Sequence, residues 1–263
     1  MEIRHKPSLL RVDNIFFDFD GVLNDVELMN RELRRLIAER MDGEWGGGVE
    51  NWLASVHRAF EVADRSARGS HLREENILEW LGEYDRIWLE TLFSAGGLEP
   101  PTEGASELGW RIREEAYANI DSIYPEARQA LEILKGRPGS GQAAAGPSER
   151  SLYLASGGRT ARLDTLLKKA GLRGYFLQLF GCDTVNIVKE SPEYYRRIFQ
   201  RLGVAPTLCL VVDDNPDCIQ WAHHAGAAAA LLDRNGDAPP SGPVLLISDL
   251  LQLAQALQAA ESR

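Results

Sequence analysis

The sequence has few cysteines and no long apolar run. Its three cysteines, Cys182, Cys209 and Cys218, include no closely spaced pair. This scarcity argues against a disulfide-stapled secreted domain or a cysteine zinc site, and it favours a reducing cytoplasm. No stretch approaches the ~18–20 apolar residues of a membrane span, and the N-terminal residues lack the apolar core of a signal peptide. We therefore expect a cytoplasmic protein with no membrane partner.

Basic residues are outnumbered as well. The chain of 263 residues has 29 Lys and Arg against 39 Asp and Glu, a net charge of −10. Such an acidic balance argues against nucleic acid as the main partner. An anionic substrate would need local positive charge or a bound cation. The length allows one large domain or two moderate ones with a substantial core, and it leaves the oligomeric state open.

The most informative stretch is an apolar run that ends in two acids. Residues 14–17 are Asn-Ile-Phe-Phe, and Asp18, Asp20 and Gly21 follow almost at once. A short run without polar alternation is typical of a strand buried on both faces of a parallel sheet. The two carboxylates would then lie at the carboxyl end of that strand, where open α/β sheets bind their ligands.

A second apolar run, residues 152–155, ends in Ser156-Gly157-Gly158-Arg159, and residues 160–170 carry a helical stripe that stops at Gly171. A hydroxyl and free backbone amides between a strand and a helix can cradle a phosphate. An ordinary strand-to-helix turn is the alternative for this segment. Arg159, close after Ser156, is a candidate contact for an anionic substrate.

Two later segments also place charged residues just before a predicted helix. Lys189 precedes Ser191-Pro192, a good N-cap and first helical residue. The apolar run 208–212 ends in Asp213 and Asp214, and the pair at 215–216 begins the next helix. If parallel strands deliver these residues to one sheet edge, the clustered carboxylates raise one another's pKa unless a cation compensates. Mg²⁺, which takes oxygen ligands, meets that need, and Lys189 would add neutralisation.

Residues 22–121 have helical rather than strand periodicity. Four amphipathic stretches follow one another: 24–40, a segment carrying Leu53, Val56 and Phe60, 73–93, and 108–120. They predict a helical bundle inserted after the first strand. Five of the six tryptophans lie here, and we expect most of them to be packing residues, with one or two lining a pocket.

The rest of the chain completes an α/β pattern. Pro125 should open a helix, residues 136–148 form a loop rich in Gly, Pro and Ala, strands follow at 227–232 and 244–247, and a helix closes the chain at 250–259. The predicted fold class is α/β, with a Rossmann-like, doubly wound parallel sheet as core and an inserted helical-bundle domain.

These segments together resemble the four motifs of the haloacid dehalogenase (HAD) superfamily. The aspartate-x-aspartate form of the first motif is typical of its phosphatases and phosphomutases, and the helical insertion resembles that of phosphoglycolate phosphatases and β-phosphoglucomutases. The resemblance implies a core of residues 1–21 and 122–263 and a cap of residues 22–121. It also implies that Asp18 is the nucleophile, Asp20 the general acid/base, Ser156 a phosphoryl ligand and Lys189 the residue that steadies nucleophile and phosphate.

The resemblance further implies a Mg²⁺ site. Asp214 would be the metal ligand and Asp213 its support, with Asp18 and Asp20 completing the set. The family often has another acid where this chain has Cys218. Whether the neighbouring Asp217 joins the metal shell therefore stays open.

The leading hypothesis is a Mg²⁺-dependent phosphatase that hydrolyses a small organic phosphomonoester through an aspartyl-phosphate. Ser156, Gly157, Arg159 and Lys189 would bind the substrate, a small phosphorylated metabolite. A sugar phosphomutase of the same fold, or a non-catalytic HAD-like binding protein, is the alternative. Haloacid dehalogenation is disfavoured because it gives Asp20 no task. The histidines, His57, His71, His223 and His224 among them, are expected to be structural or surface residues.

Overall fold

The computed structural model describes residues 12–101, 103–135, 150–236 and 244–261. The predicted loop at 136–148 lies outside these residues. Within them, no helix is both long and apolar enough to cross a membrane.

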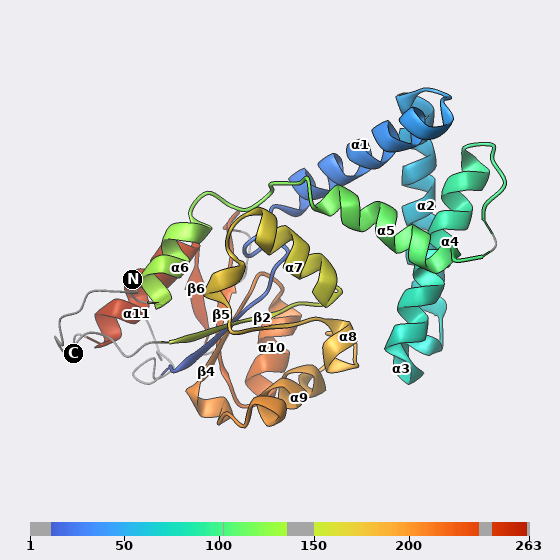
Figure 1. Ribbon diagram of the computed structural model, residues 1–263. Coiled ribbons are helices and arrows are strands. Elements are labelled where there is room, and N and C mark those ends of the chain that lie inside the picture. The colour runs from blue at the N-terminus through green and yellow to red at the C-terminus, as the bar shows by residue number, and fades with distance from the viewer. Residues whose placement is uncertain (1–11, 102, 136–149, 237–243, 262–263) are drawn as a thin grey trace.

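A parallel six-stranded sheet forms the core, as the apolar runs predict. Its strand order is β3-β2-β1-β4-β5-β6, and every pairing is parallel. The strand that carries the first acids therefore lies between the strands that carry Ser156 and Asp213 (Figure 1). The strands are β1 (Asn14–Phe17), β2 (Ser151–Ala155), β3 (Gln178–Phe180), β4 (Cys209–Asp213), β5 (Ala228–Leu232) and β6 (Leu245–Ile247).

Helices cover both faces of this sheet. Ile15 and Phe17 of β1 belong to the core cluster that includes α6 (Ala127–Lys135), α7 (Thr160–Lys169) and α11 (Leu250–Glu261). Phe16 points into a second cluster with α9 (Pro192–Leu202) and α10 (Pro216–His224). Because successive side chains of a strand face opposite ways, a strand that is apolar throughout needs cover on both sides. The short α8 (Cys182–Val185) links β3 to α9.

A helical cap is inserted between β1 and α6. It contains α1 (Val26–Trp45), α2 (Val49–Gly69), α3 (Leu72–Glu75), α4 (Ile77–Ala95) and α5 (Ala105–Tyr117). Helix α2 packs against α1 and α4, and α5 packs against α1 and α4. Figure 1 shows this unit beside the core. Helix α5 contacts α7, and α4 contacts α8. The fold class is thus the one expected from the sequence, whereas the exact division at residues 21/22 and 121/122 stays a prediction.

Two short connections join cap and core, and they pair with each other. The backbone N–H of Asp25 donates to the carbonyl of Ser122 over 2.7 Å, and that of Tyr124 donates to the carbonyl of Leu23 over 2.9 Å. Asn24 and Ile123 form an antiparallel bridge between these bonds. The entry and exit segments of the cap therefore form one two-stranded ribbon.

Several predicted element boundaries were wrong. The predicted helix 73–93 is two helices, because Asn76 is extended and its side chain caps α4 by accepting the Glu79 N–H. The first cap helix continues to Trp45 and stops only at three glycines with positive φ, residues 46–48. The last cap helix ends at Tyr117, and α6 begins two residues after Pro125. Strand β3, only three residues long, was not predicted.

The tryptophans divide into three groups. Trp52 and Trp88 are buried in the cap, as expected of packing residues. Trp80 and Trp110 are half-buried and line a cavity, which matches the expected one or two pocket residues. Trp45 differs from the expectation, since it is 41% exposed at the end of α1.

Candidate active site

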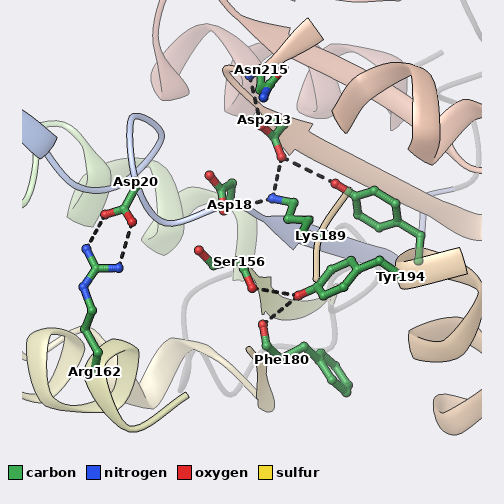
Figure 2. Close-up of polar contacts among 10 residues, drawn as sticks. Asp18, Asp20, Ser156, Arg162, Phe180, Lys189, Tyr194, Asp213 and Asn215 are labelled. Carbon is green, nitrogen blue, oxygen red and sulfur yellow. Dashed lines mark hydrogen bonds and ion pairs between the residues drawn. The ribbon is translucent and has the colours of Figure 1, made fainter. Parts of the chain in front are cut away.

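The carboxyl ends of β1 and β4 bring together residues from three predicted segments. Nζ of Lys189 lies 2.9 Å from Oδ1 of Asp18 and 2.6 Å from Oδ2 of Asp213. All three residues are at least nine-tenths buried. Figure 2 shows the lysine between the two carboxylates. The backbone N–H of Asn215 donates to Asp213 over 2.9 Å, so this carboxylate is fixed from two sides.

Burial and charge act in opposite directions at this centre. Burial raises the pKa of Asp18, Lys189 lowers it, and Asp213 and Asp20 raise it further, so that it reaches about 7. Burial opposes the charge of Lys189, but Asp18 is the strongest of the groups that raise its pKa well above the ordinary value. Lys189 is therefore a fixed cation at neutral pH. The Asp18 carboxylate is poorly compensated, and its Oδ1 accepts no well-aligned hydrogen bond.

Asp214 completes a group of three carboxylates that could hold a metal ion. One oxygen each from Asp18, Asp213 and Asp214 lies within 4.8 Å of the others. Asp214 is exposed, and partial burial of its carboxylate together with the charge of Asp213 raises its pKa. Gly21 permits this approach, because it has φ +78° and a Cβ there would lie 1.9 Å from Oδ2 of Asp214. Oxygen-only ligands, among them the buried Asp18 Oδ1 that accepts no well-aligned hydrogen bond, fit a hard cation such as Mg²⁺.

Asp20 lies outside this group, and its partner was not predicted. Arg162 of α7 donates to Oδ2 of Asp20 through Nη1 over 2.8 Å and to Oδ1 through Nη2 over 2.7 Å. Asn24 donates to Oδ1 over 2.9 Å. Although burial raises the pKa of Asp20, Arg162 lowers it below the ordinary value. The Asp20 side chain is thus engaged by an arginine rather than by the carboxylate cluster with which it was predicted to bind metal (Figure 2).

The predicted phosphate cradle follows β2. Ser156 is buried, and Tyr194 of α9 donates its hydroxyl toward the Ser156 carbonyl over 2.9 Å. In the described part of the chain no protein acceptor bonds the amides of Gly157 and Gly158. The amide of Thr160, in contrast, donates to Asp183 over 2.8 Å. The amides of the two glycines are therefore available to an anion, whereas the Thr160 amide at the start of α7 is bonded to Asp183.

A cavity of about 470 Å³ extends from this edge into the cap. Asp20, Gly157 and Arg159 contribute from the core. The cap contributes apolar and aromatic walls and two arginines. Its lining includes Leu33, Arg34, Phe60, Trp80, Tyr84, Trp110, Arg113 and Tyr117. The volume suits a small organic ligand.

Arg159 joins core to cap inside this cavity. Its Nη2 donates to Oδ2 of Asp85 over 2.7 Å, and its guanidinium lies 4.4 Å from the centroid of Trp110. Asp85 is buried in α4 and also accepts from Arg113, whose guanidinium lies 4.9 Å from the Trp88 ring centroid. The buried Asp85 carboxylate therefore binds two guanidinium groups, those of Arg113 and Arg159. One negative charge does not neutralise both, so the three side chains together keep a net positive charge.

Other predicted candidates do not join the site. Asp217 is exposed and lies outside the three-carboxylate group, so its side chain is a surface residue of α10. Cys218 is buried next to Asp213, and burial raises the pKa of its thiol. All three cysteines are free. The four histidines considered are exposed, as expected, at positions 57, 71, 223 and 224.

Reasoning from the sequence missed three contributors: Arg162, Asp85 and Arg234. Arg234 donates to the carbonyls of Gly21 over 3.2 Å and Val22 over 2.9 Å, and thereby holds the turn after Asp20. No local motif surrounds any of the three. The only sequence signal is that an arginine and an aspartate occupy otherwise amphipathic helices, a pattern that usually indicates solvent exposure.

The protein combines a capped α/β fold with buried carboxylates and a lysine at one edge of the sheet. This combination is typical of one class of hydrolases. The model of the haloacid dehalogenase-like hydrolases matches residues 12–226 of this chain. The chain therefore belongs to the haloacid dehalogenase-like hydrolase family, as its motifs indicate, and it is a hydrolase.

Relatives and solved structures agree with this placement. A phosphatase of Mycobacterium tuberculosis is 27% identical over 262 residues, covering 95% of this chain and 99% of the relative. A phosphoserine phosphatase of Thermus thermophilus is 29% identical, covering 89% and 97%. A HAD hydrolase of Bacillus subtilis, solved with magnesium, aligns with a TM-score of 0.63 at 18% identity over 94% of this chain and 99% of that chain. At that identity the structural likeness shows the fold alone.

Proposed function

We propose that the protein is a Mg²⁺-dependent phosphatase of a small organic phosphomonoester, acting through an aspartyl-phosphate. The observation that carries the proposal is the arrangement of Asp18, Lys189, Asp213 and Asp214 at one sheet edge, beside the free amides after Ser156. Two relatives are named as phosphatases, which supports the same activity.

In the first step, a carboxylate oxygen of Asp18 attacks phosphorus. The bond between phosphorus and the ester oxygen breaks, and the departing oxygen takes a proton from the carboxylic acid of Asp20. Lys189 holds Asp18 in place from 2.9 Å and offsets negative charge that accumulates on the phosphoryl group. Because Arg162 and Asn24 occupy both Asp20 oxygens in the structure, Asp20 must leave Arg162 before it can act.

In the second step, water attacks the phosphorus of the aspartyl-phosphate. The Asp20 carboxylate takes a proton from that water, and the bond between phosphorus and the Asp18 oxygen breaks to release phosphate. Asp18, Asp213 and Asp214 would hold a magnesium ion. When bound, that ion supplies positive charge to offset the carboxylates and the phosphoryl oxygens.

Substrate binding follows from the same geometry. The amides of Gly157 and Gly158 and the Ser156 hydroxyl are the proposed phosphoryl ligands, with Lys189 as the adjacent cation. Arg159, which lines the cavity and shares Asp85 with Arg113, is proposed to contact the organic part of an anionic substrate. The expected cytoplasmic location, and the expected lack of nucleic-acid or membrane partners, stay predictions.

Hydrolysis of p-nitrophenyl phosphate with Mg²⁺, compared with chelator, tests the proposal. Wild-type protein should release nitrophenolate only with the metal, and the Asp18→Asn variant should not release it. A folded protein that binds phosphorylated ligands but hydrolyses no ester would be a binding protein. A sugar phosphomutase would instead transfer phosphoryl between two positions of a sugar phosphate faster than to water.

A further inference from the structure

We infer that Arg162 is a specificity-determining residue that binds a second anionic group, a carboxylate or a phosphate, on the organic part of the substrate. This inference rests on the proposed function. It names the substrate class as phosphomonoesters whose leaving alcohol is itself anionic. In the structure, Asp20 occupies the place on Arg162 that this second group would take.

The first argument is the geometry of the pair. Two nitrogens of Arg162 meet the two oxygens of Asp20 at 2.8 and 2.7 Å. This two-pronged contact is the one that arginine makes with any carboxylate or phosphate. The guanidinium also lies 5.5 Å from the ring centroid of Tyr117 and 5.8 Å from that of Phe19. Its position is therefore set by its surroundings and does not depend on Asp20 alone.

The second argument is that Asp20 cannot serve two partners. Oδ1 accepts from Asn24 and Arg162, and Oδ2 accepts from Arg162. To reach the ester oxygen of a phosphoryl group on Asp18, the Asp20 carboxylate must turn away from the arginine. The Arg162 side chain is only 12% exposed and has no other acidic partner in the described part of the chain. An unpaired, buried guanidinium is costly. An anionic group on the substrate removes that cost.

The third argument is the position of Arg162 in the cavity. It lines the same space of about 470 Å³ as Asp20, Gly158 and Arg159. Because Asp20 is the proposed acid for the ester oxygen and Arg162 contacts its carboxylate at 2.7 Å, we expect a group a few bonds from that oxygen to lie within reach of Arg162. Arg113 and Arg159 share the buried Asp85, so each already has a partner. Arg34 also lines the cavity, but its guanidinium lies 6.0 Å from the Phe60 ring centroid and, among the described residues, it contacts no acid that must move during the reaction. Arg162 is the arginine whose partner must leave during the reaction.

Matched esters test this inference. Ethyl, propyl and butyl phosphate have neutral chains. The phosphate esters of glycolate, 3-hydroxypropanoate and 4-hydroxybutanoate add a carboxylate, and the bisphosphates of the corresponding diols add a phosphate. At one or more chain lengths, kcat/KM should be on the order of 10- to 100-fold higher for an anionic member than for the neutral one. The anionic series with the larger ratio identifies the group that Arg162 binds.

Variants then separate specificity from structure. In Arg162→Gln, KM for the preferred anionic ester should rise, and the preference in kcat/KM for that ester over the neutral one should fall to within about threefold. A merely structural arginine would lower kcat for both esters alike. Arg162→Lys should keep part of the preference. Arg173→Gln, which removes an ion pair between Arg173 and Asp164 outside the site, should keep the wild-type ratio.

A binding measurement covers the case in which Arg162→Gln does not fold by circular dichroism. On wild-type protein, at least one of 3-phosphonopropanoate and propane-1,3-bisphosphonate should inhibit at least about tenfold more tightly than propylphosphonate. Equal inhibition, equal kcat/KM across all chain lengths, or an unchanged preference in a folded Arg162→Gln variant would overturn the inference and leave the phosphatase proposal intact. Failure to hydrolyse every ester, p-nitrophenyl phosphate included, would overturn the proposed function itself.

Discussion

Replacing Asp18 by asparagine should stabilise the metal-free protein at pH 8 while it abolishes hydrolysis. Asp18 is buried, and its pKa is raised because burial disfavours the ionised carboxylate. Asparagine has nearly the same shape and no charge. Lys189 keeps its contact with Asp213 in the variant, so no buried cation is left alone.

The magnitude follows from proton linkage. The pKa of Asp18 is about 7 in the folded protein, against an ordinary value of 3.8. Between these values the folded state binds more protons than the unfolded state, so the free energy of unfolding decreases as pH rises from about 4 to about 7. Since one pKa unit is worth about 1.4 kcal/mol, ionised Asp18 should destabilise the fold by on the order of 4 kcal/mol at pH 8. Below pH 4 this difference between wild type and variant should vanish.

Urea unfolding in the presence of chelator, from pH 4 to pH 8, measures this difference. The free energy of unfolding of Asp18→Asn should exceed that of wild type by an amount that increases with pH. Added Mg²⁺ should stabilise wild type at pH 8. Asp217→Asn is the matched control, because Asp217 is exposed near the same strand ends. A difference that is flat, or that has the opposite sign, would show that Lys189 keeps Asp18 ionised without cost, and our account of the site electrostatics would be wrong.

Three further predictions follow from other parts of the site. Asp214→Ala should lose most of the activity and the Mg²⁺-induced rise in melting temperature, while Asp217→Ala should keep both; equal effects would contradict the assignment of the metal ligands. Asp85→Ala should lower the free energy of unfolding by roughly 3–5 kcal/mol in urea titrations, because it leaves two guanidinium groups without their shared carboxylate. Replacing residues 26–117 by a short linker should reduce kcat/KM for the best natural substrate far more than for p-nitrophenyl phosphate, whose leaving group needs little help; an unchanged ratio in a folded protein would show that the cap does not choose the substrate.

Much of the core could be predicted because its signals are local. Strands that are buried on both faces appear as continuous apolar runs, and the residues just after those runs must share one edge of a parallel sheet. That reasoning placed Asp18 near Asp213 and Asp214, which the structure confirms. It could not give the strand order, because the helical crossovers between parallel strands do not specify which strands become neighbours.

The partner of Asp20 shows where local reasoning ends. Asp20 and Arg162 are 142 positions apart, and their pairing depends on where α7 lies relative to the turn after β1. The sequence does not contain this arrangement, so Asp20 was assigned to the metal site by resemblance and its arginine partner was not predicted. The same limit applies to Asp85, which reads as a surface residue of an amphipathic helix until α5 and the turn after β2 bring two arginines against it.

The paired connections between cap and core have a mechanical consequence. Two separate connections could move independently, but these two are bonded to each other at Asp25–Ser122 and Leu23–Tyr124, so we expect them to move as one unit. Asn24 lies in this ribbon, contacts Ser122 and donates to Asp20. Any movement of the cap that displaces the ribbon should therefore also displace the amide that holds the Asp20 carboxylate.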